Sequence, residues 1–177
     1  MSREELEACI EANGREIYSF CCQLTRDRQE ADDLYQDTFL KMVEVGDRLE
    51  IEQNPKGYLL TVAVNLWKNR KRKWAWRQRI TGPVVSMEDA VLELPSGEQP
   101  PEEQIISLEE RKLVQQAVAR LPDRYRLPVL LFYMEGLKLS GIAEVLKIPE
   151  GTVKSRLFKA KKMLRTELEV VLNEERS

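Results

Sequence analysis

The sequence predicts an all-α protein of two small helical domains joined by a flexible acidic linker. Apolar residues recur at three- and four-residue spacings on both sides of the middle of the chain, and no segment alternates as a strand would. Between these parts, residues 80–110 carry eight acids and four prolines but no lysine or arginine, a composition typical of an unpacked linker. We therefore expect domains at residues 1–80 and 107–172 and a linker at residues 81–106.

Two helices are expected at the start of the first domain. The first helix should be interrupted at Gly14, and its apolar stripe consists of Leu6, Ile10, Ile17, Phe20 and Leu24. The second helix should end at Gly46 and Asp47, and its stripe consists of Ala31, Leu34, Tyr35, Thr38, Met42 and Val45.

A third helix should begin where Asn54 can cap it and Pro55 fits its first position. Its apolar stripe consists of Leu59, Val62, Ala63, Leu66 and Trp67. Charge changes sign along this domain, because residues 1–53 contain 14 acids and 6 bases whereas residues 68–79 contain seven bases and no acid. The third helix therefore leads into a strongly cationic stretch.

The second domain should begin with a capping box at Ser107–Glu110, followed by a helix that Pro122 ends. The apolar stripe of this helix consists of Leu113, Val114, Ala117 and Leu121. The next helix should end at Gly136, and Pro128 within it predicts a bend or a late helix start. A short helix at residues 139–146, a three-residue turn and a basic helix from near Pro149 then follow in the order of a helix-turn-helix.

The basic helix separates an apolar face from a cationic one. Val153, Leu157, Ala160 and Leu164 recur at helical spacing and should face the core. The side chains left pointing outward are Lys154, Ser155, Phe158, Lys159, Lys161 and Lys162, with Arg156 at the margin. A solvated charged surface is the alternative interpretation, but the preceding short helix and turn favour a helix that enters the major groove of DNA.

The residue content argues against most catalytic sites. The chain has no histidine and only three cysteines, Cys9, Cys21 and Cys22, without C-x-x-C spacing, so we expect buried thiols, no metal and no cofactor. Triads that need histidine are excluded, and no carboxylate pair is suggestively spaced. No apolar run approaches the roughly 20 residues of a membrane span, and the acidic N-terminus lacks a signal-peptide core. We expect a cytoplasmic protein with no membrane insertion of its own.

Three stretches resemble bacterial RNA polymerase sigma factors of the extracytoplasmic-function (ECF) class. "DRQEADDLYQDTFLKMVE" and "NPKGYLLTVAVNLWKNRKR" resemble regions 2.2 and 2.3 to 2.4, and "LPDRYRLPVLLFYMEGLKLSGIAEVLKIPEGTVKSRLFKAKKML" resembles domain four. The resemblance covers both expected domains in the family's order. It implies a protein that binds core RNA polymerase and promoter DNA, with a double-stranded minus-35 and a melted minus-10 element. An anti-sigma factor is a further partner implied by the family alone.

In the first domain the resemblance assigns two sets of residues. The second helix resembles the core-polymerase-binding surface, with its family pattern D-L-x-Q-E on Asp33, Leu34, Gln36 and Asp37, where Asp37 replaces the usual Glu. The third helix and the loop at residues 45–56 resemble the minus-10 reader, whose residues would be Tyr58, Asn65, Lys68, Arg70, Lys71 and Arg72. Simple core packing remains open for Tyr58 and Trp67, and is the favoured interpretation of Trp74 and Trp76.

In the second domain the family pattern falls on residues 151–161 and implies minus-35 contacts. The contacting residues would be Lys154, Ser155, Arg156, Phe158, Lys159 and Lys161. Lys159 replaces a frequent Arg and gives up the bidentate fork that suits guanine. Lys147 stands where the family often has Gly, and a left-handed backbone there would cost about 1 kcal/mol.

The sequence thus predicts an ECF sigma factor that directs transcription initiation, and not an enzyme. A free-standing transcriptional regulator with the same helix-turn-helix is the main alternative, but it leaves the basic helix of the first domain unused. A helical enzyme is a weaker alternative, because no catalytic constellation is present.

Overall fold

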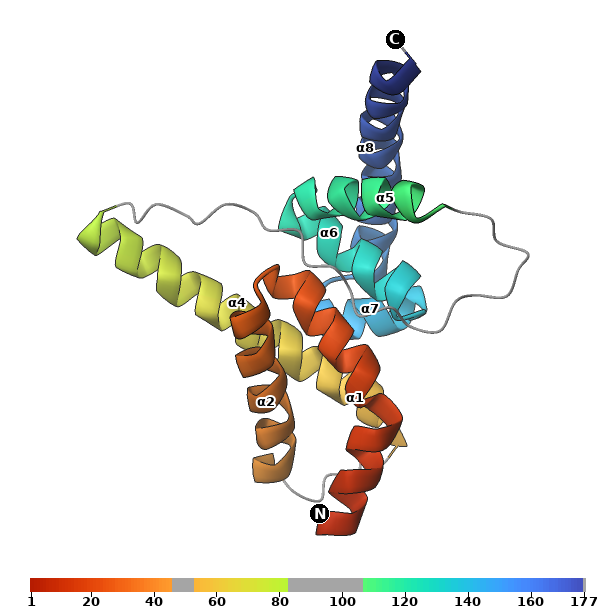
Figure 1. The fold of residues 1–177 in the computed structure, drawn as a ribbon. Coiled ribbons are helices and arrows are strands. Elements are labelled where there is room, and N and C mark those ends of the chain that lie inside the picture. Colours follow the sequence, from red (N-terminus) through yellow and green to blue (C-terminus); the bar gives the residue numbers. More distant parts are fainter. Residues whose placement is uncertain (46–52, 83–106, 177) are drawn as a thin grey trace. The chain divides into compact units, whose positions relative to one another are not determined.

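The computed structural model describes residues 1–45, 53–82 and 107–176, which form two compact units on either side of residues 83–106 (Figure 1). Every regular element among these residues is a helix, so the all-α prediction is confirmed. The expected linker lies almost entirely outside the described residues, as does most of the loop at residues 45–56. Their structure therefore stays a prediction.

The first unit packs three helices, α1 (Arg3–Thr25), α2 (Arg28–Val45) and α4 (Pro55–Thr81), each against the other two. Its core contains Ile17, Phe20, Leu24, Leu34, Met42, Leu59, Leu60 and Ala63. α4 begins as predicted, because the Asn54 side chain accepts a hydrogen bond of 3.0 Å from Gly57 N and Pro55 opens the helix. α2 is described as far as Val45, and its expected stop at Gly46 and Asp47 lies outside the described residues.

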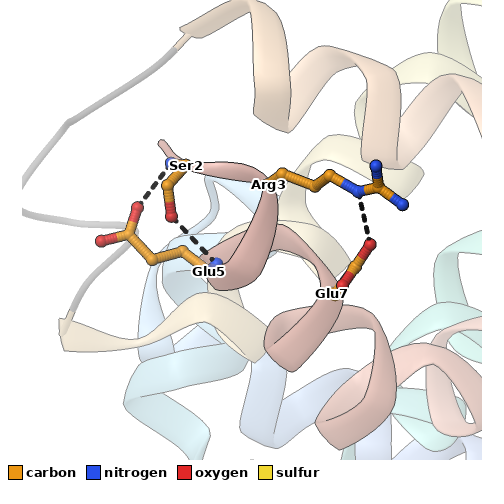
Figure 2. A network of polar contacts seen from close by, with 4 residues as sticks. All are labelled: Ser2, Arg3, Glu5 and Glu7. Carbon is orange, nitrogen blue, oxygen red and sulfur yellow. Dashed lines mark hydrogen bonds and ion pairs between the residues drawn. The ribbon is translucent and has the colours of Figure 1, made fainter.

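A capping box that the sequence analysis did not single out starts α1 (Figure 2). Glu5 N donates to Ser2 Oγ over 3.2 Å, and Ser2 N donates to Glu5 Oε2 over 2.6 Å. Arg3 Nε donates to Glu7 Oε1 one turn along, over 2.8 Å. The capping bonds satisfy amide groups that the first turn of a helix otherwise leaves unpaired.

The predicted interruption at Gly14 is wrong, since α1 runs unbroken through it. Gly14 is buried, and a Cβ atom there would lie only 2.8 Å from Tyr35 Oη on α2. The missing side chain lets α1 and α2 approach closely, and this packing outweighs the weaker helix propensity of glycine. Ile10, one turn earlier, is 37% exposed despite its place in the expected stripe.

A polar contact and an aromatic cluster join α1 to α2. Tyr18 Oη donates to Asp32 Oδ1 over 2.7 Å, and this hydrogen bond, helped by partial burial, raises the pKa of Tyr18 to about 12. The ring of Tyr35 lies 5.5 Å from that of Tyr18 and 4.9 Å from that of Phe39. The expectation of buried thiols holds for Cys21 and Cys22, whereas Cys9 is only half-buried.

The second unit contains α5 (Leu108–Arg120), α6 (Asp123–Val129), the π-helix η1 (Leu130–Met134), α7 (Leu139–Leu146) and α8 (Glu150–Arg176). The capping box at Ser107 and the bounds of the short helix agree with the sequence predictions. Its core contains Ala117, Leu121, Tyr125, Leu127, Leu131, Ile142, Val145, Val153, Leu157 and Ala160. α8 continues past residue 172, the expected end of the domain.

Pro128 does not delay its helix, because α6 already begins at Asp123. The proline ring is buried inside α6, and the chain widens directly after it into η1, where Glu135 N donates to Leu130 O over 3.2 Å. The missing amide is thus accommodated by an irregular turn and not by a late start.

Candidate nucleic-acid and protein interfaces

α7 and α8 form the predicted helix-turn-helix. Lys147 joins them with φ 55° and ψ 46°, so the backbone at this turn position is left-handed, and Ile148 N donates to Ala143 O over 3.1 Å. α8 is anchored by Val153, Leu157 and Ala160, which are at most 7% exposed. Leu164, also expected in the core, is half-buried.

The predicted outward face of α8 is the exposed one. Lys154, Ser155, Phe158, Lys159 and Lys161 are exposed and Arg156 is half-buried at the margin. Several ammonium groups lie close to aromatic rings: Lys162 Nζ is 4.8 Å from the centre of the Phe158 ring, and Lys159 Nζ is 5.5 Å from that of Tyr125. These contacts hold cations at the surface without neutralising them. The face can therefore supply donors to phosphates and base edges.

α4 carries a second candidate surface. Tyr58 and Asn65 are seven positions apart and therefore lie on one side of the helix, where both are half-buried. Lys68 and Arg70 are half-buried, and Lys71 and Arg72 are exposed. The amide of an asparagine can form hydrogen bonds with a base edge, and the neighbouring cations can bind the phosphates of the nucleic-acid backbone.

The tryptophans of α4 divide into one buried and two exposed residues. Trp67 is 6% exposed, packs in the core and has Lys71 Nζ 4.8 Å from its ring centre. Trp74 and Trp76 are 52% and 64% exposed, so the favoured interpretation of both as core residues is wrong. Both residues belong to the C-terminal half of α4, which projects beyond α1 and α2 (Figure 1).

The third candidate surface lies on α2. Asp33, Gln36 and Asp37 are exposed, whereas Leu34 is fully buried and anchors the helix. Two apolar residues that the sequence analysis missed, Leu40 and Val43, continue the exposed face and are 56% and 42% exposed. Both lie outside the core stripe, four and seven residues after Gln36, and this spacing could have predicted that they share its exposed face. Mixed apolar and acidic character suits a protein partner better than DNA.

Comparison with known proteins decides the family. Residues 9–78 match the model of Sigma-70 region 2, and residues 111–164 match that of Sigma-70, region 4. The ECF RNA polymerase sigma factor SigW of Bacillus subtilis is 31% identical over 154 residues, covering 86% of this chain and 82% of SigW. The chain belongs to the ECF class of RNA polymerase sigma factors. Its function is promoter recognition and transcription initiation.

A second relative and two solved structures are also similar to this chain. The RNA polymerase sigma-H factor of Pseudomonas aeruginosa is 29% identical over 164 residues, or 89% of this chain and 83% of that protein. The sigma factor RpoE of Bartonella quintana, solved in complex with the anti-sigma factor NepR, matches with a TM-score of 0.64 at 22% identity, over 95% and 96% of the two chains. CnrH, solved with the cytosolic domain of CnrY, matches with a TM-score of 0.66 at 16% identity, over 96% and 90%. At these identities both structures show a shared fold.

An ion pair connects two of the surfaces of this sigma factor. Arg70 Nη2 of α4 lies 2.5 Å from Asp37 Oδ2 of α2, with both side chains partly exposed. The structure thus brings together one residue predicted to bind polymerase and one predicted to bind DNA. An exposed pair of this kind contributes at most about 1 kcal/mol, so either partner can readily exchange it for another.

Neither a metal centre nor a membrane span is found in residues 1–45, 53–82 and 107–176. In these ranges no three His, Cys, Asp or Glu side chains are placed to hold a metal ion. No helix there combines the length and apolar character needed to cross a bilayer.

Proposed function

We propose that the three surfaces of this sigma factor divide the work of initiation. The exposed face of α2, with Asp33, Gln36, Asp37 and Leu40, docks on core RNA polymerase, while Leu34 supports it from the core. The face of α4 around Tyr58 and Asn65 binds the melted minus-10 element, with Lys68, Arg70, Lys71 and Arg72 near its phosphates. The exposed face of α8, Lys154 to Lys161, enters the major groove of the minus-35 element.

The observation that carries this proposal is the exposed cationic face of α8 in a helix-turn-helix. Its apolar anchors alternate with the outward cations over the same turns, so packing against the core fixes which side chains reach the DNA. Polar and cationic side chains of α4, in a separate unit, provide a second DNA surface. Two such surfaces suit a bipartite promoter, which a free-standing regulator would not need.

We further propose a non-enzymatic protein that acts with polymerase in the cytoplasm and is held inactive by an anti-sigma factor. The sigma factor RpoE of Bartonella quintana has been solved in complex with the anti-sigma factor NepR, and CnrH, which has a similar fold, has been solved with the cytosolic domain of CnrY. The complex of RpoE with NepR was formed by another sigma factor, and it supports a partner of the same kind for this chain.

Reconstitution with core polymerase tests the proposal. The wild-type chain should give transcripts that start downstream of a common pair of sequence elements, whereas core polymerase alone should not. A regulator would instead bind its site without polymerase and would not confer initiation on core enzyme.

Charge reversal on α2 tests the docking surface. Asp37→Arg should weaken binding to core polymerase, because it reverses a charge on the docking face and leaves Arg70 without its acid. Glu11→Arg, the same charge change on an exposed residue of α1, should leave this affinity within about twofold. Equal affinities of the two variants, measured with labelled chain and core polymerase, would remove Asp37 from the interface.

A further inference from the structure

The proposed minus-10 face of α4 continues beyond the part of the helix that packs in the core. Asn65, Asn69, Arg72 and Trp76 follow one another at spacings of four, three and four residues. These spacings place all four on one side of an α-helix. Asn65 lies among the buried residues of α4, which end at Trp67, whereas Trp76 belongs to the C-terminal half of this helix. That half projects past α1 and α2 (Figure 1). The face therefore extends roughly 16 Å from Asn65 to Trp76.

Side chains of this extension surround a shallow hollow that is open to solvent and lined by cations. A hollow of about 390 Å³ is lined by Asn69, Arg72, Lys73 and Trp76. Arg72 Nη2 donates to Asn69 Oδ1, which holds the guanidinium beside the hollow. The Trp76 ring is 64% exposed, although a large aromatic ring gains most free energy when it is buried. Stability of the domain does not explain an exposed tryptophan among cations.

The charge of this segment and the exposed ring of Trp76 limit the class of ligand that can bind here. Residues 68–79 contain seven bases and no acid, so the surface attracts a polyanion. A flat aromatic face accepts a nucleobase of any sequence, provided that the base is unstacked from its neighbours. A duplex keeps its bases stacked and offers only groove edges and phosphates. Single-stranded DNA supplies both the free base and the phosphates.

We propose that Trp76 is a stacking platform for a base of single-stranded DNA, with Arg72 and Lys73 on the flanking phosphates. The site rests on the proposed function, because it prolongs the face that begins at Tyr58 and Asn65. It extends that face by some three turns of helix and adds a contact independent of base sequence. The sigma factor thereby grips more of a melted strand than its minus-10 contacts alone allow.

Trp74 provides a matched control on the same helix. It lies nine positions after Asn65, or about two and a half turns, and therefore points to the opposite side of α4 from the proposed platform. It is 52% exposed, so its replacement also removes an exposed indole from the same cationic segment. Only the side of the helix distinguishes Trp74→Ala from Trp76→Ala.

The test uses the full-length chain and a labelled oligothymidylate of about 16 nucleotides, near the upper end of known single-strand site sizes. Affinity is measured by fluorescence anisotropy for this strand and for a duplex of equal length. Trp76→Ala should weaken single-strand binding by about fivefold or more, and Trp76→Phe should retain most of the affinity. Trp74→Ala should change it less than about twofold, and the duplex affinity should be unaltered by either alanine variant.

The salt dependence of binding tests the contributions of Arg72 and Lys73 separately from that of Trp76. For the single strand, the magnitude of the slope of log affinity against log salt should fall by about 0.7 in Arg72→Ala and by about 0.7 in Lys73→Ala. This is the change expected when each variant loses one phosphate contact. In a Trp74→Phe background, the oligothymidylate should quench the emission of Trp76, which a merely structural role would not produce.

Three results would overturn the site. They are failure of the wild-type chain to bind the strand, equal losses of single-strand affinity in Trp74→Ala and Trp76→Ala, and a loss of duplex affinity in Trp76→Ala equal to its loss of single-strand affinity.

Promoter-specific initiation by the reconstituted polymerase is measured separately. If initiation fails while the Trp76 effect is present, the proposed function is wrong and the single-strand site stands. Normal initiation without a Trp76 effect would remove the single-strand site and leave the proposed function intact.

Discussion

α4 and α8 are both basic helices of 27 residues, but they relate their charge to the core in different ways. In α8 the buried anchors Val153, Leu157 and Ala160 lie in the same turns as the exposed cations. In α4 the buried residues end at Trp67 and most of the cations follow, on turns that project past the core. α8 is thus anchored directly beneath its proposed DNA-binding face, whereas α4 is anchored only in its N-terminal half.

The difference matches the two ligands that we propose. Reading base edges in a duplex groove requires side chains held in a fixed position, because a misplaced donor loses its bond. A single strand is flexible and can adapt to a row of cations and rings. Anchors beneath each contact are therefore needed in α8 and are dispensable in the second half of α4.

The largest effect should come from removing an anchor of α8. Leu157→Ala should lower the free energy of unfolding of the second unit by about 2–5 kcal/mol, because a buried leucine leaves a cavity, and minus-35 binding should fall with it. Trp74→Ala, in the projecting half of α4, should stay within about 0.5 kcal/mol.

The two units can be followed separately during unfolding. All three tryptophans lie in the first unit, so tryptophan emission reports that unit, whereas circular dichroism reports both. In Leu157→Ala the dichroism transition should shift and the emission transition should not. A shift of both transitions would contradict the independence of the units, and a shift of neither would show that Leu157 does not anchor α8.

The same contrast explains what the sequence could predict. In α8 one periodic pattern separates the core face from the exposed face, so the outward residues were identified correctly from Val153 and its repeats. In α4 the pattern ends at Trp67, and beyond it an aromatic residue was interpreted by its general preference for burial. That preference fails where the helix leaves the core, which only the fold reveals.

Contacts between residues close in the sequence could be predicted, whereas contacts between distant residues could not. The caps at Asn54 and Ser107 depend on residues three positions apart, and both were predicted. The close approach of Gly14 to Tyr35 and the pair of Asp37 with Arg70 join residues 21 and 33 positions apart. No short sequence pattern contains such contacts, so the continuity of α1 and the link between α2 and α4 emerged only from the structure.

An intermediate effect is expected from single cations of α8. Lys159→Ala should weaken minus-35 binding by roughly 1–3 kcal/mol and relax the preference at one or two base pairs if Lys159 reaches a base edge. Lys162→Ala should weaken binding evenly across sequences, because we expect Lys162 to contact phosphate, which carries no base identity. Binding measured on a set of singly substituted sites separates these outcomes, and two indistinguishable profiles would contradict base reading by Lys159.

The smallest effects concern backbone strain, and they compare the units once more. Lys147 and Arg26 both have φ 55°, a left-handed conformation that costs a residue with a Cβ about 1–2 kcal/mol, whereas glycine adopts it freely but loses more entropy on folding. Lys147→Gly should therefore stabilise the second unit by about 1 kcal/mol, seen as a higher midpoint in the dichroism transition. Arg26→Gly should stabilise the first unit less, because this change removes the packing of the half-buried Arg26 side chain, whereas the exposed Lys147 side chain makes little packing that could be lost.

Since Lys147 faces solvent at the turn, its replacement by glycine should leave minus-35 affinity within about twofold. A gain in stability accompanied by a loss of affinity would instead mean that the lysine itself contacts DNA, and the DNA surface would then include the turn as well as α8.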